Sequence, residues 1–226
     1  MAVRLWSVAI DANDPTRLGR FWADALGWVY GEADGYAFAE GGAGTLTRLE
    51  CLDAPNERTG PSWMHFDLSS SSLEDQRSYV ARLLSLGATH LDVGQEPDAT
   101  HVVLADPEGN AFCVLEPTNR FVDRGSRLGA LSCDGSRSCG LFWRDVLGWP
   151  LVWDEGEETG VRADDGGVFF TFGGPPGWEK TAKNRFHVDL LPLAHSTRDE
   201  EVDRLLALGA VHADVGQGDD VPWVVL

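Results

Sequence analysis

The sequence predicts an α+β protein built from tandem domains, in which paired βαβββ modules form curved, cup-shaped mixed sheets with helices on the outside. The first observation behind this prediction is a long repeat. ARLLSLGATHLDVGQ at 81–95 returns as DRLLALGAVHADVGQ at 203–217, with eleven of fifteen positions identical at an offset of 122. Shorter pairs keep nearly the same offset, among them FWADALGW with FWRDVLGW and MHFDL with FHVDL. Solenoid repeats are shorter, with periods of about 20–50 residues, so we expect a duplicated domain, at 1–117 and 127–226.

The composition narrows the class of protein. Of the 226 residues, 43% are hydrophobic and 24% charged, and the formal charge at pH 7 is −18. This acidity excludes nucleic acid and anionic membranes as partners, because both require a basic face. No apolar run approaches the roughly 20 residues of a membrane span, and the N-terminus lacks the layout of a signal peptide. The four cysteines contain no CxxC pair, which favours a cytoplasmic protein with free thiols.

The second observation is the change of periodicity within each half. The segment 4–11 alternates as a strand does, with Trp6, Val8 and Ile10 on one face and Ser7 on the other. An Asp-Pro pair then predicts a helix start. The apolar face of that helix follows helical spacing and is expected to be core: Leu18, Phe21, Trp22, Ala25 and Leu26. Three short strands should follow, at 28–31, 36–40 and 45–52.

The same order recurs in the second module. The sequence predicts a strand at 63–68, a helix from Ser72 to about Leu86, and strands near 88–92, 100–105 and 111–116. After a linker at 116–127 the second half retraces this order. It stops at Leu226, the counterpart of Leu104, and shows no counterpart of ADPEGNAFCVLE. We therefore expect domain two to lack its last strand, either because the chain was shortened or because a neighbour covers that sheet edge.

Polar residues on the strand faces that point away from the helices are the candidates for function. In the strand at 63–68, apolar side chains alternate with Trp63, His65 and Asp67. The second copy carries the equivalent residues Arg185, His187 and Asp189. A histidine and an aspartate on this face in both copies favour a functional pocket. The alternative is that hydrogen bonds or water simply satisfy both histidines.

Two further residues extend this set. Ser7 and Cys113 lie on the same kind of strand face, so Ser7, His65 and Cys113 converge if the strands of domain one form one curved sheet. A cysteine on a strand is more often inert packing than a nucleophile. The expected ligand pocket therefore comprises Ser7, Trp63, His65, Asp67, Cys113, Arg185, His187 and Asp189.

The FW-x-x-x-LGW helix, the HFDL strand, the RLLSLGA segment and the ADPEGNAFCVL hairpin together resemble the vicinal oxygen chelate superfamily. That superfamily includes glyoxalases, bleomycin-resistance proteins and extradiol dioxygenases, and the resemblance is to its glyoxalase-like domain branch, in two tandem copies. It implies, for enzymatic members, a metal held by residues of the first, fifth and eighth strands, commonly His, His and Glu. By position these are Ser7, His65 and Cys113 in the first copy. The second copy offers Leu128 and His187.

Only the histidines keep a usual ligand type, so we expect no standard three-ligand metal centre; His65 and Cys113 are the metal candidates. Three functions remain in competition. The first, which we favour, is a metal-free binder of a small organic molecule in the sheet cup. The second is a metal-dependent lyase, isomerase or dioxygenase in which His65 is a ligand or general base, and the third is a scaffold with vestigial cups. A monomer whose two domains imitate a dimer, or a homodimer, fits each of them.

Overall fold

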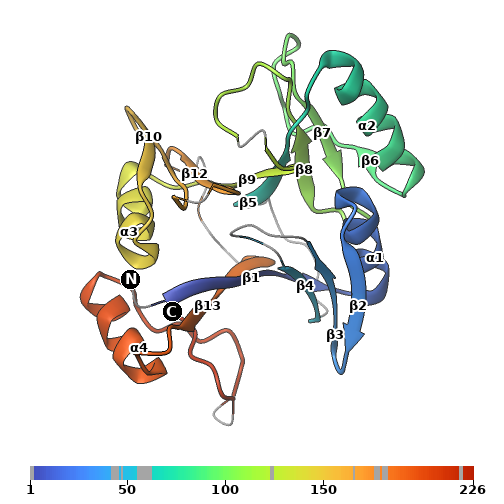
Figure 1. Ribbon diagram of the computed structural model, residues 1–226. Coiled ribbons are helices and arrows are strands. Elements are labelled where there is room, and N and C mark those ends of the chain that lie inside the picture. The colour runs from blue at the N-terminus through green and yellow to red at the C-terminus, as the bar shows by residue number, and fades with distance from the viewer. Residues whose placement is uncertain are drawn as a thin grey trace.

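The computed structural model describes residues 3–41, 46, 48–54, 63–122, 125–164, 166–175, 179, 183–218 and 221–226. Four modules follow one another along the chain (Figure 1). Each of the first three is a strand, a helix and three more strands, and the fourth is described as one strand and one helix. The predicted α+β class is confirmed.

The first module consists of β1 (Val3–Ala12), α1 (Pro15–Leu26), β2 (Val29–Ala33), β3 (Tyr36–Glu40) and β4 (Arg48–Asp53). The second consists of β5 (Met64–Leu68), α2 (Leu73–Ser85), β6 (Thr89–His90), β7 (Val102–Ala105) and β8 (Ala111–Val114). The third consists of β9 (Leu128–Cys133), α3 (Arg137–Leu147), β10 (Leu151–Glu155), β11 (Glu158–Val161) and β12 (Phe169–Gly173). The fourth consists of β13 (Phe186–Pro192) and α4 (Arg198–Ala207).

The strands form two mixed sheets, and each sheet combines strands from both halves of the chain. The five-stranded sheet has the order β13-β1-β4-β3-β2, and the eight-stranded sheet has the order β10-β11-β12-β9-β5-β8-β7-β6. The joins are antiparallel, between β1 and β13 and between β5 and β9. In Figure 1 the two sheets cross the molecule one above the other. The first and fourth modules therefore build one sheet, and the second and third build the other.

Helix α1 links the two sheets through its apolar face. Asp14 caps its start by accepting a hydrogen bond from the backbone N–H of Arg17, at 3.0 Å, and Gly27 ends it with a φ of 69°. The helix packs on β3 and β4 of the five-stranded sheet. Its Trp22 is fully buried, and the Trp22 ring lies 5.0 Å from Phe66 and 5.2 Å from Phe112 of the eight-stranded sheet. The prediction that these aromatics are core is confirmed.

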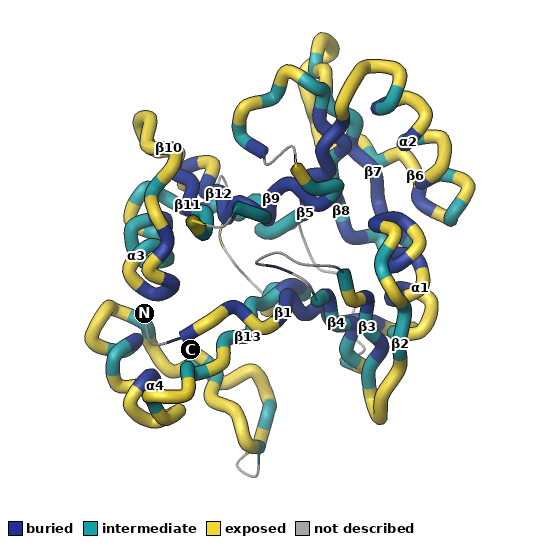
Figure 2. Tube along the Cα trace, viewed as in Figure 1, coloured by how far each residue is buried: buried dark blue, intermediate teal, exposed yellow. Residues whose placement is uncertain are grey.

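Burial is uneven over the four modules. Figure 2 shows buried stretches in β1, β5, β8 and β9, whereas α4 and the segment after it are largely exposed.

A β-bulge alters the first strand, β1. The β1–β13 register shifts between Leu5 and Ser7, so Leu5 joins the buried core and Trp6 is 38% exposed beside the Arg4 and Arg48 guanidinium groups. The prediction that Trp6 shares a face with Val8 and Ile10 is therefore wrong, because simple alternation does not anticipate an inserted residue.

Candidate functional site

A polar cluster lies at the centre of the eight-stranded sheet. His65 and Asp67 come from alternate positions of β5, and Cys113 of β8 is the register partner of Asp67. The His65 Nε2 atom lies 3.5 Å from Asp67 Oδ1. Potential ligand atoms of the imidazole, the carboxylate and the thiol all lie within 4.8 Å of one another. Three of the predicted pocket residues therefore meet at one point.

Two hydroxyl groups that sequence reasoning missed continue this cluster across the sheet. The Ser132 hydroxyl of β9 donates a hydrogen bond to Asp67 Oδ2 and lies 2.8 Å from the Thr171 hydroxyl of β12. Ser132 is the register partner of His65. A row of polar side chains thus runs through β8, β5, β9 and β12. The sequence did not place these hydroxyl groups beside Asp67, because it did not predict that β5 of the first half pairs with β9 of the second half.

The pairing of β5 with β9 also corrects one prediction for the second copy, in which Leu128 was expected at the position equivalent to Ser7. Leu128 lies opposite Leu68 in the core, and Ala130 lies opposite Asp67. In the other sheet it is Ser7 that lies opposite Asp189. The structural counterpart of Ser7 is therefore Ala130 rather than Leu128, because the bulges in β1 and β9 displace the alignment that the helices imply.

The charges of the cluster follow from its surroundings. Burial would lower the pKa of His65, but the Asp67 carboxylate and hydrogen bonds with Asp67 and Cys113 raise that pKa well above the usual histidine value. Burial raises the pKa of the Cys113 thiol, and the charge on His65 opposes this effect. Both shifts favour the protonated forms of the imidazole and of the thiol.

An apolar cluster adjoins the polar one on the same side of the sheet. It consists of four buried residues, with Cys113 packed against them: Leu115, Val122, Ala130 and Phe169. Val122 belongs to the linker between the sequence halves, so the linker contributes to this surface. Beside Val122, the Phe121 ring lies 5.2 Å from the Trp153 ring of β10 in an edge-to-face arrangement. Cys113 is therefore the residue at which the polar and apolar parts of this face meet.

The donor set of the polar cluster fits a divalent ion of the zinc type in number and kind, since it offers an imidazole nitrogen, a carboxylate oxygen and a sulfur. These three residues differ from the predicted ligand positions, which were Ser7, His65 and Cys113: Asp67 takes the place of Ser7. Binding would require the loss of the protons on His65 and Cys113 and would compete with the hydrogen bond from Ser132 to Asp67.

Ser7 lies in the five-stranded sheet and contacts the second His-Asp pair. It is fully buried, and its hydroxyl donates a hydrogen bond to Asp189 Oδ2 at 2.9 Å. His187 Nε2 lies 3.8 Å from Asp189 Oδ1, and His187 Nδ1 is buried without a hydrogen-bond partner among the described residues. Burial raises the pKa of Asp189. The structure thus separates six of the eight predicted residues into two groups, one in each sheet.

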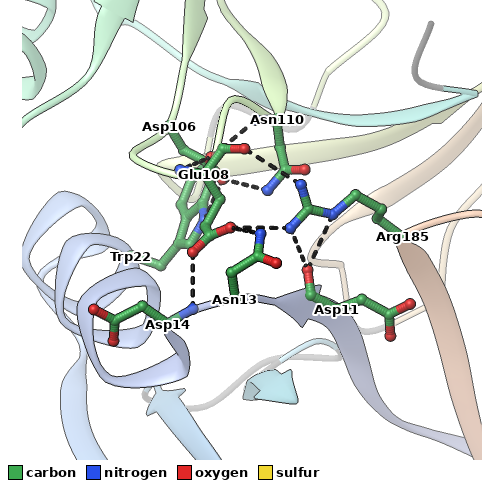
Figure 3. Close-up of polar contacts among 8 residues, drawn as sticks. All are labelled: Asp11, Asn13, Asp14, Trp22, Asp106, Glu108, Asn110 and Arg185. Atoms are coloured by element: carbon green, nitrogen blue, oxygen red, sulfur yellow. Dashed lines mark hydrogen bonds and ion pairs between the residues drawn. The ribbon is translucent and has the colours of Figure 1, made fainter. Parts of the chain in front are cut away.

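Arg185 belongs to a buried polar network rather than to either polar face (Figure 3). Its guanidinium donates to the Asp11 carbonyl at 2.7 and 3.1 Å and to the Glu108 carbonyl at 3.3 Å, and it pairs with Glu108 Oε2 at 3.2 Å. Its side chain is 10% exposed. Arg185 therefore connects the start of β13 to the end of β1 and to the β7–β8 hairpin.

Trp63, the last of the predicted pocket residues, precedes β5 and is half-buried. Its carbonyl accepts a hydrogen bond from the Asp134 N–H at 2.9 Å.

The other hydrogen bonds drawn in Figure 3 involve the Asp-Pro-Glu-Gly-Asn motif at residues 106–110. Asp106 Oδ1 accepts hydrogen bonds from the backbone N–H groups of Glu108 and Asn110, each at 2.9 Å. Its other oxygen accepts from the Trp22 indole at 3.2 Å. Glu108 Oε1 accepts from the backbone N–H of Asp14, at the start of α1, at 2.9 Å. The motif thus joins the hairpin to α1 and builds the fold rather than the polar cluster.

Comparisons with known proteins agree with this architecture. The model of the glyoxalase-like domain family matches residues 7–115 and 130–226. Glyoxalase I from Zea mays superposes with a TM-score of 0.62 at 15% identity, over 99% of this chain and 91% of that one. A mutant of the same maize protein gives 0.62 at 14% identity, over 92% of this chain and 79% of that one. At such identities the likeness concerns the fold alone. A search of curated proteins found no match.

Within the described residues, no helix is both long and apolar enough to span a membrane. The family model covers both sequence halves, and the two curved mixed sheets have the architecture of the maize protein. The chain therefore belongs to the glyoxalase-like domain family.

Proposed function

We propose that the protein binds a small organic molecule against the polar face of the eight-stranded sheet. The observation that carries this proposal is the contact of Cys113 with both clusters: the polar group of His65 and Asp67, and the apolar group around Phe169. Ligand sites are typically apolar surfaces with a few polar groups that orient the ligand. The cytoplasmic location expected from the sequence is part of this proposal, supported by four free cysteines.

The chemistry of the face suggests the class of ligand. The raised pKa of His65 favours its protonated form, which is a positively charged hydrogen-bond donor, and the side chain is 31% exposed. It suits a carbonyl, carboxylate or hydroxyl oxygen. The apolar group on the other side of Cys113 suits a hydrocarbon or aromatic body next to that oxygen. We therefore favour a small, mainly apolar molecule with one oxygen-rich end.

The second candidate is a metal-dependent enzyme, and the closeness of three ligand types favours it. His65, Asp67 and Cys113 would hold the ion, which would polarise an oxygen of a bound substrate. Ser132 would hold Asp67 in place through the hydrogen bond to its second oxygen. The apolar group would orient the substrate and exclude water.

Metal content separates the two candidates. The protein, purified without a histidine tag, is analysed by plasma mass spectrometry before and after incubation with zinc, manganese, nickel or iron and desalting. A ligand screen by tryptophan fluorescence follows. His65→Ala is the test variant, and His187→Ala, which alters the equivalent residue of the other sheet, is the matched control.

Three results are distinguishable. Loss of ligand affinity in His65→Ala alone, without retained metal, supports the binder. Near-stoichiometric metal that is lost in His65→Ala but kept in His187→Ala supports the metal enzyme and leads to lyase, isomerase and dioxygenase assays. If neither variant alters metal or ligand binding, both proposals fail and the scaffold is the better explanation.

A further inference from the structure

A cavity lies between the loop that precedes α2 and the linker that leads into β9. Its volume is about 400 Å³, within the range of about 300–1,000 Å³ that is common for small-molecule sites. None of its lining residues belongs to the polar or the apolar cluster of the eight-stranded sheet. The residues that line it are Ser69, Ser70, Ser71, Asp75, Pro117, Gly125, Ser126 and Arg127.

Four consecutive serines form the loop between β5 and α2, and three of them have a partner. The Ser69 hydroxyl donates to a linker carbonyl, and the Ser71 hydroxyl donates to Asp75 Oδ2 at 3.0 Å. Ser72 caps α2 by accepting a hydrogen bond from the backbone N–H of Asp75 at 3.0 Å. The Ser70 hydroxyl is buried and has no partner among the described residues. Buried polar groups are nearly always hydrogen-bonded, so a ligand in the cavity would supply the partner that Ser70 lacks.

The two charged residues of the cavity compensate each other. Two hydrogen bonds of 2.8 Å join the Arg127 guanidinium to the Asp75 carboxylate, and they lower the pKa of Asp75. The side chains of Arg127 and Asp75 are 36% and 23% exposed, so a ligand can reach both. An anion would meet the Asp75 carboxylate in a chain of charge −18. A cation would meet the guanidinium and the positive end of α2, so the cavity favours an uncharged ligand.

Hydrogen-bonding groups of both kinds remain for such a ligand. Arg127 uses two of its five N–H groups for Asp75 and a third for the Ser69 carbonyl, at 2.9 Å. Within the described part of the chain, the other two have no partner, and Asp75 Oδ1 accepts from Arg127 alone. A hydroxyl group both donates and accepts. A molecule with several hydroxyl groups can therefore bind the guanidinium, the carboxylate and the serines together.

We propose that this cavity binds a small, uncharged, polyhydroxylated molecule, of the monosaccharide or polyol type. Arg127, Asp75 and the serine loop would bind its hydroxyl groups, and Ser70 would gain a partner. Pro117 adds an apolar lining residue for its carbon atoms. This site is independent of the ligand proposed for the eight-stranded sheet.

The test titrates glucose and sorbitol into the isotopically labelled whole chain and follows the backbone amides by NMR. Saturable shifts should be confined to residues 69–75 and 125–127. Gluconate and glucosamine, which are also rich in hydroxyl groups, carry a negative and a positive charge. Each should bind at least about fivefold more weakly than glucose, because it places a charge beside Asp75 or Arg127.

Three variants test the residues that carry the argument. Ser70→Ala should weaken glucose and sorbitol binding about fivefold, as expected for one neutral hydrogen bond. It should not lower the melting temperature, because the hydroxyl has no partner to lose among the described residues. Ser136→Ala, at the start of α3 and outside the cavity, is the matched control and should bind as the wild type does. Asp75→Asn leaves the charge of Arg127 uncompensated, so it should bind gluconate better than glucose.

Four results would overturn the proposal. The first is the absence of saturable shifts with glucose and sorbitol, or shifts spread over the whole surface. The second is a wild-type preference for gluconate or glucosamine, and the third is an unchanged affinity in Ser70→Ala. The fourth is loss of glucose and sorbitol binding in His65→Ala, which would place these molecules on the eight-stranded sheet instead. Unchanged binding in His65→Ala supports a separate site, whatever that variant does to the ligand of the sheet.

Discussion

The Asp67 carboxylate contacts His65 through one oxygen and Ser132 through the other. Its Oδ1 atom lies 3.5 Å from His65 Nε2, and its Oδ2 atom accepts a hydrogen bond from the Ser132 hydroxyl. The contact with Ser132 crosses from the first half of the chain to the second. The orientation and charge of His65 therefore depend on the β5–β9 pairing, and the candidate site exists only when both halves of the chain have folded together.

Replacement of Asp67 by asparagine should lower the pKa of His65, because the carboxylate is the main cause that raises it. A raised folded-state pKa adds stability that is full below the unfolded histidine value of about 6.5 and is lost as pH rises through the folded-state value. The wild type should therefore exceed Asp67→Asn in stability by about 1–2 kcal/mol near pH 6, with a smaller excess at alkaline pH. Titration of the His65 ring protons by NMR, with urea unfolding at each pH, measures both effects. Asp189→Asn is the control and should leave the His65 titration unchanged.

The pair of Arg127 and Asp75 should stabilise the start of α2 in a pH-dependent way. Two hydrogen bonds of 2.8 Å join the guanidinium to the two carboxylate oxygens, and this pairing lowers the pKa of Asp75. A lowered folded-state pKa adds stability above the unfolded value of about 3.9 and loses it as pH falls through the folded-state value. We expect Asp75→Asn to cost about 1 kcal/mol at pH 7, since both groups are partly exposed. The difference should shrink between pH 4 and pH 2 in denaturant titrations; a constant difference would contradict the prediction.

Gly140 of α3 should not tolerate a methyl group. A Cβ at this position would lie 2.0 Å from the Thr159 hydroxyl of β11, and Thr159 is fully buried. Gly140→Ala should therefore lower the free energy of unfolding by about 1–3 kcal/mol through overpacking, despite the better helix propensity of alanine. Gly173→Ala serves as the control, because nothing lies within 4 Å of its Cβ position. Equal melting temperatures for the two variants would rule out the close packing of α3 on β11.

Arg185 should matter for stability rather than for ligand affinity. Arg185→Met leaves Glu108, whose side chain is 7% exposed, without its cationic partner, and loss of one member of a buried ion pair costs about 3–5 kcal/mol. Glu108→Gln should be destabilising as well, and the double variant should cost less than the sum of the two. Chemical denaturation measures all three variants. An Arg185→Met protein with wild-type stability and reduced ligand binding would instead place Arg185 in a binding site.

Much of the candidate site was predictable because strand alternation is local. The spacing of His65 and Asp67 in β5, and the position of Cys113 on its strand, follow from a period of two. Ser7 was assigned to the same group, yet it lies in the other sheet beside Asp189. Ser132 and Thr171 were missed, because a hydroxyl on a strand has no distinguishing spacing and both come from the second half of the chain. The division into domains at 1–117 and 127–226 stays a prediction, while each sheet draws strands from both halves.

The sequence by itself determined the repeat, the helices with their caps and apolar faces, and the face on which each side chain of most strands lies. These features depend on residues a few positions apart, and local sterics and hydrogen bonding decide them. Only the tertiary structure decided that β1 joins β13, that β5 joins β9, and that bulges move Trp6 and Leu128 out of their expected places. The reason is that the backbone edge of a strand offers the same N–H and C=O groups whatever its side chains. Packing of the whole molecule, as where Trp22 meets Phe66 and Phe112, therefore selects the partner.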